Sequence, residues 1–581
     1  MIINPKKIKY TNGKISVTSL SFEFAEDTDG RILRRAEKLF GKEALSVGGT
    51  PVYVTYKNNL CDDYSFSDSQ GYTLEIRDNG ISIAGESAQG AFYGLNMLYA
   101  LLSEKNELEC AVITDSPDIL HRGFYLDVSR GRIPAVAEIK KLIDRLALCN
   151  VNSLQLYIEH TFEFKGLEEI NAEYGCYTVE DIGEIVKYCD EMFIDCIPSL
   201  STFGHMYIIL QNEKYRHLCE LENYEPNDHI WWERMRHHTI NYADDESIAF
   251  VKSFIDRYAE LFKSKYFNIC CDETFDIAKG RNKGADKIEA YLSFARKIIA
   301  NLTEKNLIPM MWGDIIWESP ASVKELPEET ILLNWNYDAD ITDKSIKYYS
   351  EHNCNQIVCP GVSCWNRMCE CISVSQDNIL KSVDFAFKYK AKGVLNTCWG
   401  DFGHTAPLEN CIYGMALCAA KSWNVQNFDI DEFSLSVSKL LYGYNGNIAD
   451  ILIKTEPFYS IWGGTFTWLQ KRKGLNGPEN KITLDIFEKG HCEAAEAVKM
   501  LESAVMEADI KTNLILAAKM NFLLSKAVIK KLKNEPLDEK NICDIEKAYS
   551  EYRKVWCKTN KKDELFILDG YFEELKHNLQ F

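Results

Sequence analysis

The sequence has no long hydrophobic run and no surplus of positive charge. No stretch reaches the roughly 18 consecutive apolar residues of a membrane span, and the opening MIINPKKIKY has no apolar segment of signal-peptide length. The formal net charge is -20, which disfavours nucleic acid or an anionic membrane as the main partner, because an acidic surface repels both. We therefore expect a cytoplasmic protein that binds neither nucleic acid nor membranes.

Metal and cofactor motifs are also missing. The 20 cysteines are scattered without a CxxC pair, and several lie in apolar segments, which is typical of buried free thiols in a reducing compartment. The nearest approach to a zinc motif is Cys364, Cys369 and Cys371, whose spacing is unlike that of structural zinc sites and which have no histidine nearby. We expect no metal and no organic cofactor.

The 581 residues exceed what one hydrophobic core organises, so two or three domains are expected. We assign residues 1–118 to a small N-terminal α+β domain. The segment YTLEIRDNGISIAG alternates apolar and polar residues around an Asp-Asn-Gly turn at 78–80, which predicts a β-hairpin. Helix-like spacing of leucines follows through Leu95, Leu98 and Leu102.

Residues 119–428 alternate short apolar runs with amphipathic stretches. The predicted strands are 122–128, 153–159, 195–201, 267–273, 308–314, 330–337, 355–363 and 393–401. A Thr178-x-x-Asp181 capping box opens one of the intervening helices. Eight such units predict an α/β protein with a (β/α)₈ TIM barrel as its catalytic domain. A doubly wound open sheet is the alternative, but it is disfavoured because no Gly-rich phosphate loop is present.

Residues 429–581 are highly charged and periodic, with no strand signal between the long segments EAAEAVKMLESAVMEAD and TNLILAAKMNFLLSKAVIKKLK. We predict a C-terminal helical domain. Its helices are expected to pack against the barrel or against a second subunit, which would make the protein a homodimer.

The active site of such a barrel lies at the carboxyl ends of its strands. The polar and aromatic residues at these ends are Asp127, Glu159, His160, His205, Asp272, Glu273, Trp312, Asp314, Trp335, Tyr337, Trp365, Trp399 and Asp401. Indole rings stack on the apolar C–H faces of sugars, and carboxylates bind sugar hydroxyls. Each tryptophan taken alone is more often a core residue, but their shared position predicts a carbohydrate ligand.

The stretch FNICCDE places Asp272 and Glu273 side by side at the end of the fourth strand. Neighbours within a strand face opposite ways, but both can face one ligand where the chain turns. One of the acids could instead cap a helix or pair with Lys279 or Arg281. Two carboxylates this close should repel, so we expect a raised pKa that keeps one protonated, as a general acid requires.

From about residue 70 to 425 the chain resembles glycoside hydrolase family 20, the β-N-acetylhexosaminidases. The hairpin with SAQGAFYGLNMLYALL resembles the end of the family's N-terminal domain, and DSPDILHRGFYLDVSR resembles the entry into its barrel. IPSLSTFGHM resembles the Pro-Gly-His stretch after strand three, matching at Pro198, Gly204 and His205. FNICCDE stands in the place of the catalytic Asp-Glu motif.

The resemblance implies a role for each matching residue. It assigns catalysis to Asp272 and Glu273, and the binding of the sugar's distal hydroxyls to Arg122. The remaining substrate-binding residues that we assign are His205, Trp312, Trp335, Tyr337, Trp365, Trp399 and Asp401. Trp312, Trp335 and Trp399 match the walls of the acetamide pocket, and Asp401 stands where the family carries a glutamate.

Several positions depart from the family pattern. Asn268, Cys270 and Cys271 replace a histidine and two small residues before the Asp-Glu pair. Ser201 stands where an aspartate normally supports the histidine, so an Asp-His-Glu relay is broken or rebuilt. The usual acetamide-binding tyrosine has no match after strand seven, and Tyr337 is our candidate for its role. These departures indicate a divergent branch.

The resemblance implies a retaining exo-β-N-acetylhexosaminidase that acts on terminal β-linked GlcNAc or GalNAc of an oligosaccharide or glycoside. The substrate's own acetamide would be the nucleophile and would form an oxazolinium intermediate, with Glu273 as acid and base and Asp272 orienting the acetamide. Two alternatives stay open: an ordinary glycosidase with Asp314 or Asp401 as second carboxylate, and a catalytically silent sugar-binding protein. His229, Trp231, Trp232 and the pair His237-His238 are expected to cover the pocket or simply to pack.

Overall fold

All eight strands predicted for the central segment are present and close into a parallel barrel. They are β7 (His121–Asp127), β8 (Ser153–Ile158), β9 (Asp195–Leu200), β10 (Tyr266–Asn268), β11 (Ile308–Trp312), β12 (Ile331–Trp335), β13 (Asn355–Cys359) and β14 (Gly393–Cys398). In this computed structural model each strand pairs with the next in parallel, and β14 pairs with β7 to complete the ring. The TIM-barrel fold class is thereby confirmed, and the open sheet is wrong.

The structure describes residues 4–45, 48–58, 63–223, 237–365, 367–401, 403–458, 484–562 and 565–579. The helices around the barrel are α3 (Val136–Leu148), α4 (Glu168–Tyr174), α5 (Val179–Glu191), α6 (Tyr207–Leu210), α8 (Asp245–Ala259), α9 (Lys287–Thr303), α10 (Asp314–Glu318), α11 (Lys344–Glu351), α12 (Ile372–Lys388) and α13 (Ile412–Trp423). The capping box predicted at Thr178 and Asp181 is present at the start of α5.

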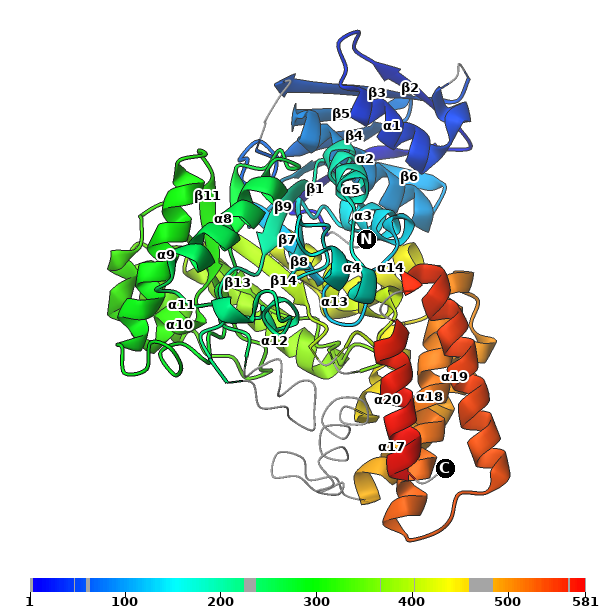
Figure 1. Cartoon of the computed structure of the whole chain (residues 1–581). Coiled ribbons are helices and arrows are strands. Elements are labelled where there is room, and N and C mark those ends of the chain that lie inside the picture. The colour runs from blue at the N-terminus through cyan, green and yellow to red at the C-terminus, as the bar shows by residue number, and fades with distance from the viewer. Residues whose placement is uncertain are drawn as a thin grey trace.

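The N-terminal part is a six-stranded sheet that lies at one end of the molecule (Figure 1). Its strands, in spatial order, are β1 (Lys7–Ser16), β6 (Glu107–Asp115), β4 (Tyr72–Arg77), β5 (Gly80–Ser87), β3 (Thr50–Asn58) and β2 (Leu20–Phe24). The predicted hairpin is the antiparallel pair of β4 and β5. Helix α1 (Gly30–Phe40) and helix α2 (Ala88–Glu104) accompany the sheet.

Helix α2 joins this sheet to the barrel. It packs on β5. On its other side Asn96 donates a hydrogen bond to the carbonyl of Ala147 in α3 (2.8 Å), and the ring of Tyr93 packs perpendicular to that of Trp423 in α13. A helix covered on both sides needs apolar residues all round, which explains why all but a few of its residues are buried.

The C-terminal segment is helical, as predicted. Its helices are α14 (Ile430–Tyr442), α15 (Ala449–Leu452), α17 (Leu484–Ser503), α18 (Ala508–Leu532), α19 (Glu539–Thr559) and α20 (Leu565–Leu579). The last four lie side by side at the end of the molecule away from the N-terminal sheet (Figure 1). Asn513 of α18 donates a hydrogen bond to Glu409, just before α13 (2.9 Å). The backbone N–H of Lys561, after α19, donates to the Ile133 carbonyl (2.9 Å).

Helix α18 needs a separate remark because of its apolar character. Among the described residues it is the one helix long and apolar enough, by length and composition, to cross a membrane, and 61% of its most apolar window is buried inside the protein. Its neighbours α17 and α19 pack along it. Its apolar surface is therefore used within the helical bundle, where a central helix needs it.

The structure corrects the role expected of Arg122. This residue lies at the amino end of β7, is 1% exposed, and donates hydrogen bonds to the carbonyls of Ile119, Leu120 and Asn150 (2.8–2.9 Å). Its guanidinium also reaches Gln70 in the loop before β4 (2.7 Å). Arg122 therefore fastens the N-terminal domain to the barrel floor, at the end of the barrel opposite to the strand ends that bear the candidate site, and does not bind sugar there.

We predict that Arg122→Met lowers the free energy of unfolding by roughly 2–4 kcal/mol, because it leaves several buried acceptors without donors. Urea denaturation followed by circular dichroism measures this loss. Arg257→Met, on the exposed side of α8, is the matched control and should change stability by less than about 0.5 kcal/mol. A loss below about 1 kcal/mol at Arg122 would show that it is not a structural anchor.

Candidate active site

A pocket of about 210 Å³ opens at the carboxyl ends of the barrel strands. Its lining residues are Arg130, His205, Asp272, Glu273, Trp312, Trp335, Tyr337, Trp365, Trp399 and Asp401. Every residue to which we assign catalysis or substrate binding is therefore here except Arg122, whereas the strand-end residues Asp127, Glu159, His160 and Asp314 do not line the pocket. The pocket also contains Arg130, which the sequence reasoning missed, although it follows β7 at the same strand-end position that selected the others.

The loop after β10 turns sharply and presents both acids to the pocket. Strand β10 ends at Asn268, earlier than predicted, and Cys270, Cys271 and Glu273 have φ of 57°, 64° and 47°. Left-handed backbone at such residues is strained and persists only where neighbours hold it. The backbone N–H of Glu273 donates to Asp314 (3.0 Å), and Tyr291 donates to the Cys271 carbonyl (3.0 Å).

Gly204 lets a second loop approach this turn. A Cβ atom on Gly204 would lie 2.4 Å from the carbonyl oxygen of Asp272, a separation that no larger residue could tolerate. The close approach brings His205, the next residue, against the two acids. The glycine of the Pro-Gly-His stretch thus sets the distance between the histidine and the Asp-Glu pair.

His205 contacts both carboxylates. Its Nε2 lies 3.2 Å from Asp272 Oδ2 and 3.4 Å from Glu273 Oε2. Burial opposes its charged form, but the charge of Asp272 and the close contacts with both acids outweigh this effect and raise the pKa of His205 to about 10. Ser201 is turned away and donates to the Gly204 carbonyl (2.8 Å). Asp272 and Glu273 therefore replace the missing aspartate as partners of the His205 ring.

The expectation that repulsion protonates one acid is wrong for the ligand-free site. Burial alone would raise the pKa of Glu273, but the close contact with the positive charge of His205, with the charge of Arg130, lowers it below its usual range. At neutral pH a protonated His205 therefore lies against an ionised Glu273. Asp314 behaves differently: burial and the charge of Asp272 raise its pKa. Its side chain accepts a hydrogen bond from the backbone N–H of Glu273.

The two acids differ in exposure and in unused hydrogen-bonding capacity. The Asp272 side chain is 10% exposed, and its Oδ1 has no hydrogen-bond partner among the described residues. The Glu273 side chain is 32% exposed. A buried carboxylate oxygen without a donor is costly and suits a ligand N–H or O–H, whereas the more open Glu273 is accessible to a leaving group or water.

Arg130 and Asp401 form the polar side of the pocket. Arg130 donates to Asp401 (3.2 Å) and to Glu159 (2.9 Å), and it reaches the Tyr157 hydroxyl (3.2 Å). Burial raises the pKa of Asp401 to about 6, although the charge of Arg130 opposes the rise. These charged groups can donate to and accept from vicinal hydroxyls of a sugar.

Aromatic rings make the rest of the wall, and the Arg130 guanidinium lies over one of them, Trp399. Trp335 and Tyr337 stack with ring centroids 5.1 Å apart, and Trp365 lies 5.2 Å from Tyr337. The Trp399 indole N–H donates to the Tyr337 hydroxyl (2.7 Å) and so fixes both rings. Trp312 is fully buried, and its Nε1 has no acceptor among the described residues. The wall suits an apolar ring face or a methyl group.

The segment after strand three is expected to cover the pocket or to pack. Of its residues, His229, Trp231 and Trp232 lie outside the described residues. His238 packs under the Asp-Glu loop, where its Nε2 contacts the Glu273 carbonyl (2.9 Å) and its backbone N–H donates to Asp276 (3.1 Å). His238 therefore supports the loop from behind and does not line the pocket.

Comparison with known proteins identifies the family. The model of the glycosyl hydrolase family 20 catalytic domain matches residues 120–366, and the model of domain 2 of the same family matches residues 4–116. The two matches together span more than half of the chain and follow the division into N-terminal sheet and barrel. The chain belongs to glycosyl hydrolase family 20.

The similar proteins are distant. A β-hexosaminidase of Porphyromonas gingivalis is 31% identical over 231 residues, which cover 35% of this chain and 29% of that protein. Human hexosaminidase D is 24% identical over 37% of this chain and 45% of its own length. The chain thus matches less than half of the length of these curated relatives.

Solved structures extend the likeness of fold over more of the chain. The chitobiase of Flavobacterium johnsoniae aligns with a TM-score of 0.62 at 17% identity, over 99% of this chain and 98% of that one. A β-N-acetylhexosaminidase of Bacteroides fragilis aligns with a TM-score of 0.59 at 19% identity, over 75% of this chain and 94% of that one.

The raised pKa of His205 predicts a specific dependence of stability on pH. Because its folded pKa is about 10, against an unfolded value of about 6.5, its stabilisation is complete below pH 6.5 and is lost as the pH rises through 10. The stability difference between wild type and His205→Gln should therefore shrink by at least ~1 kcal/mol between pH 6 and pH 10. Urea denaturation of both proteins measures it, and a constant difference would contradict the ion pair.

Proposed function

We propose that this protein is a retaining exo-β-N-acetylhexosaminidase that removes terminal β-linked GlcNAc or GalNAc from an oligosaccharide or glycoside. The observation that carries the proposal is Asp272, which lines a small pocket walled by Trp312, Trp335 and Trp399 and whose Oδ1 has no hydrogen-bond partner among the described residues. An acetamide offers an N–H for this oxygen and a methyl group for the indoles. The relatives named as β-hexosaminidases act in the same class.

The two acids would divide the reaction. Glu273 transfers a proton to the glycosidic oxygen as the bond to the anomeric carbon breaks. The acetamide carbonyl oxygen attacks that carbon from the other face and forms an oxazolinium ring, whose N–H is held by Asp272 and whose positive charge is stabilised by it. Glu273 then removes a proton from water, which opens the ring and retains the anomeric configuration.

His205 would supply the proton that Glu273 donates in this cycle. His205 Nε2 and Glu273 Oε2 lie 3.4 Å apart. In the free site the proton is on the histidine, because the pKa of His205 is raised and that of Glu273 is lowered. Such a pair titrates as a unit. A bound substrate displaces water around Glu273, which favours the neutral acid, so the proton would move from His205 to Glu273 before catalysis.

The size of the pocket favours an exo-acting enzyme. About 210 Å³ is below the roughly 300–1,000 Å³ of sites for drug-sized ligands, and it suits one terminal sugar ring. Arg130 and Asp401 would bind its distal hydroxyls, the role first expected of Arg122. Tyr337, fixed by Trp399, would take the part of the family's missing acetamide-binding tyrosine.

The ordinary two-carboxylate mechanism is less well supported. Asp314 is occupied by the backbone N–H of Glu273, and Asp401 is paired with Arg130. Asp314 does not line the pocket and Asp401 is held by Arg130, so neither suits attack on an anomeric carbon beside Glu273. The substrate-assisted route needs no protein nucleophile, which suits two adjacent acids. A silent sugar-binding protein would bind N-acetylhexosamines without hydrolysing aryl glycosides, and the activity of wild type decides this point.

We propose that the protein is cytoplasmic, because its described cysteines are free thiols. Cys110, Cys149, Cys189 and the other described cysteines are all free and mostly buried, as in proteins of reducing compartments. Cell fractionation tests this, and recovery outside the cytoplasm would oppose it.

We predict that Glu273→Gln lowers kcat/KM by about 10²–10⁴-fold on substrates with poor leaving groups, because the proton donor is lost. Substrates whose leaving group needs no proton should lose much less in the glycosylation step. Steady-state kinetics across aryl N-acetylhexosaminides measure this. Glu318→Gln, at the exposed end of α10, is the control, and equal losses on all substrates would oppose the role of Glu273 as acid.

Asp401→Asn tests the hydroxyl-binding side of the pocket. The change keeps the shape of the side chain but removes its charge, so we expect KM to rise about 10–100-fold, equivalent to one charged hydrogen bond, with a smaller change in kcat. The exposed Asp340→Asn is the control. An unchanged KM would place the distal hydroxyls elsewhere.

A further inference from the structure

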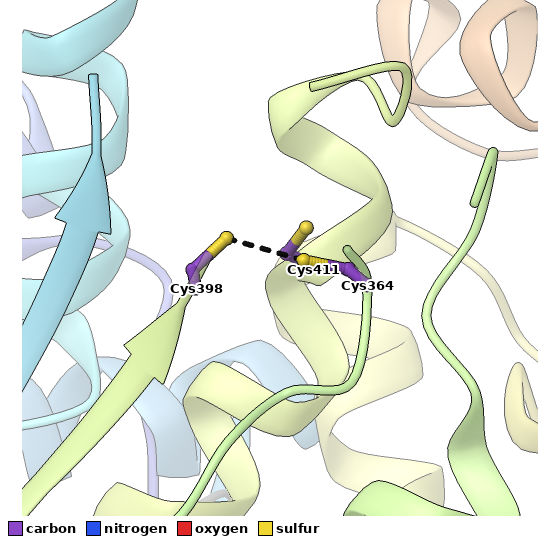
Figure 2. Close-up of side chains that lie close together, drawn as sticks. All are labelled: Cys364, Cys398 and Cys411. Atoms are coloured by element: carbon purple, nitrogen blue, oxygen red, sulfur yellow. Dashed lines mark hydrogen bonds between the residues drawn. The ribbon is translucent and has the colours of Figure 1, made fainter. Parts of the chain in front are cut away.

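Three cysteines that are far apart in the sequence meet behind the aromatic wall. Cys364 lies in the loop after β13, Cys398 ends β14, and Cys411 precedes α13; all three are buried. Their sulfur atoms all lie within 4.8 Å of one another, and those of Cys364 and Cys398 are 3.3 Å apart. Figure 2 shows the three side chains converging from a loop, a strand end and the start of a helix.

These distances fit one thiophilic metal ion. A tetrahedral zinc ion with Zn–S bonds of about 2.3 Å separates its sulfur ligands by about 3.8 Å; here one pair of sulfurs is 3.3 Å apart and no pair is more than 4.8 Å apart. A disulfide requires about 2.05 Å between sulfurs and would use only two of the three thiols. Convergence of three buried thiols is therefore better explained by a metal than by a disulfide.

An unpaired buried arginine supplies independent evidence that negative charge belongs here. Arg132 is 1% exposed and lies close enough to Cys398 and Cys411 to act electrostatically on both. Its Nη1 donates to the Ala406 carbonyl, but its Nε and Nη2 have no partner among the described residues. No carboxylate in the described part of the chain pairs with it, and a buried cation without an anion is costly.

Zinc would remove this imbalance. Three thiolates and one Zn²⁺ carry a net charge of -1, which the guanidinium of Arg132 neutralises. Three neutral thiols would leave the arginine uncompensated. Binding would release the three thiol protons to solvent. The fourth position of the ion would remain open to a small ligand, since zinc usually has four ligands.

We propose that Cys364, Cys398 and Cys411 form a structural zinc site that anchors the aromatic wall of the active-site pocket. Trp365 and Trp399 line the pocket and directly follow two of the three ligands in the chain. The ion would therefore tie the loops after β13 and β14 to the start of α13. It would take no part in the reaction itself, and its presence does not depend on the activity proposed above.

Zinc content tests the site directly. Wild type is isolated in reducing buffer, reconstituted with Zn²⁺, freed of loose metal by gel filtration and analysed by elemental mass spectrometry; about one zinc per chain is expected. Cys364→Ser, Cys398→Ser and Cys411→Ser should each retain at least ~10-fold less zinc. Cys418→Ala, buried two turns along the same helix from Cys411, is the matched control and should retain it.

A second measurement guards against variants that fail to fold. Titrating the wild-type protein with an organomercurial thiol reagent should release its zinc, detected with a colorimetric zinc indicator, once the buried thiols react. The variant Cys492→Ser with Cys543→Ser removes the two cysteines that are exposed among the described residues and should bind zinc as wild type does. Wild type that retains no zinc after reconstitution, or zinc that is lost with the exposed thiols, would overturn the proposal.

Discussion

The contact of His205 with Asp272 and Glu273 is the interaction on which the rest of the site depends. It brings a residue from the loop after β9 against two residues from the loop after β10. The contact requires left-handed backbone at His205 and Glu273 and a glycine at position 204. Without the histidine's charge, two buried carboxylates would repel each other. With it, one acid can stay ionised to orient a ligand while the other exchanges a proton.

The surrounding structure keeps this charged group in place. Asp314 holds the backbone of Glu273, and His238 supports the same loop from behind. Arg130 adds positive charge across the pocket and ties Asp401 to Glu159. These contacts account for the tolerance of polar and strained groups at this end of the barrel, because His205 lies against Asp272 and Glu273, and Arg130 against Glu159 and Asp401.

Much of the fold was predictable, because parallel strands covered by helices on one side and packed within the barrel on the other give continuous apolar runs. The pocket residues followed from the rule that barrel sites lie at strand ends. Arg122 and Arg130 lie at the two ends of β7, and the motif alone does not indicate which end faces the pocket, so the prediction for Arg122 is wrong. The lowered pKa of Glu273 could not be predicted because its cause, His205, comes from the loop after another strand.

The group of Cys364, Cys398 and Cys411 could not be predicted either, since only folding brings the three together. Cys369 and Cys371, which are nearest to Cys364 in the sequence, do not join the group.

The central claim is that Asp272 holds the substrate's acetamide while that acetamide acts as nucleophile. A thiazoline analogue of the bicyclic oxazolinium intermediate tests it most directly, by measuring its inhibition constant on wild type and on Asp272→Asn. The account predicts competitive inhibition that is far tighter than binding of the product sugar, and a loss of about 10–100-fold in the variant. A thiazoline that binds wild type no better than the product, or equally well to both proteins, would contradict it.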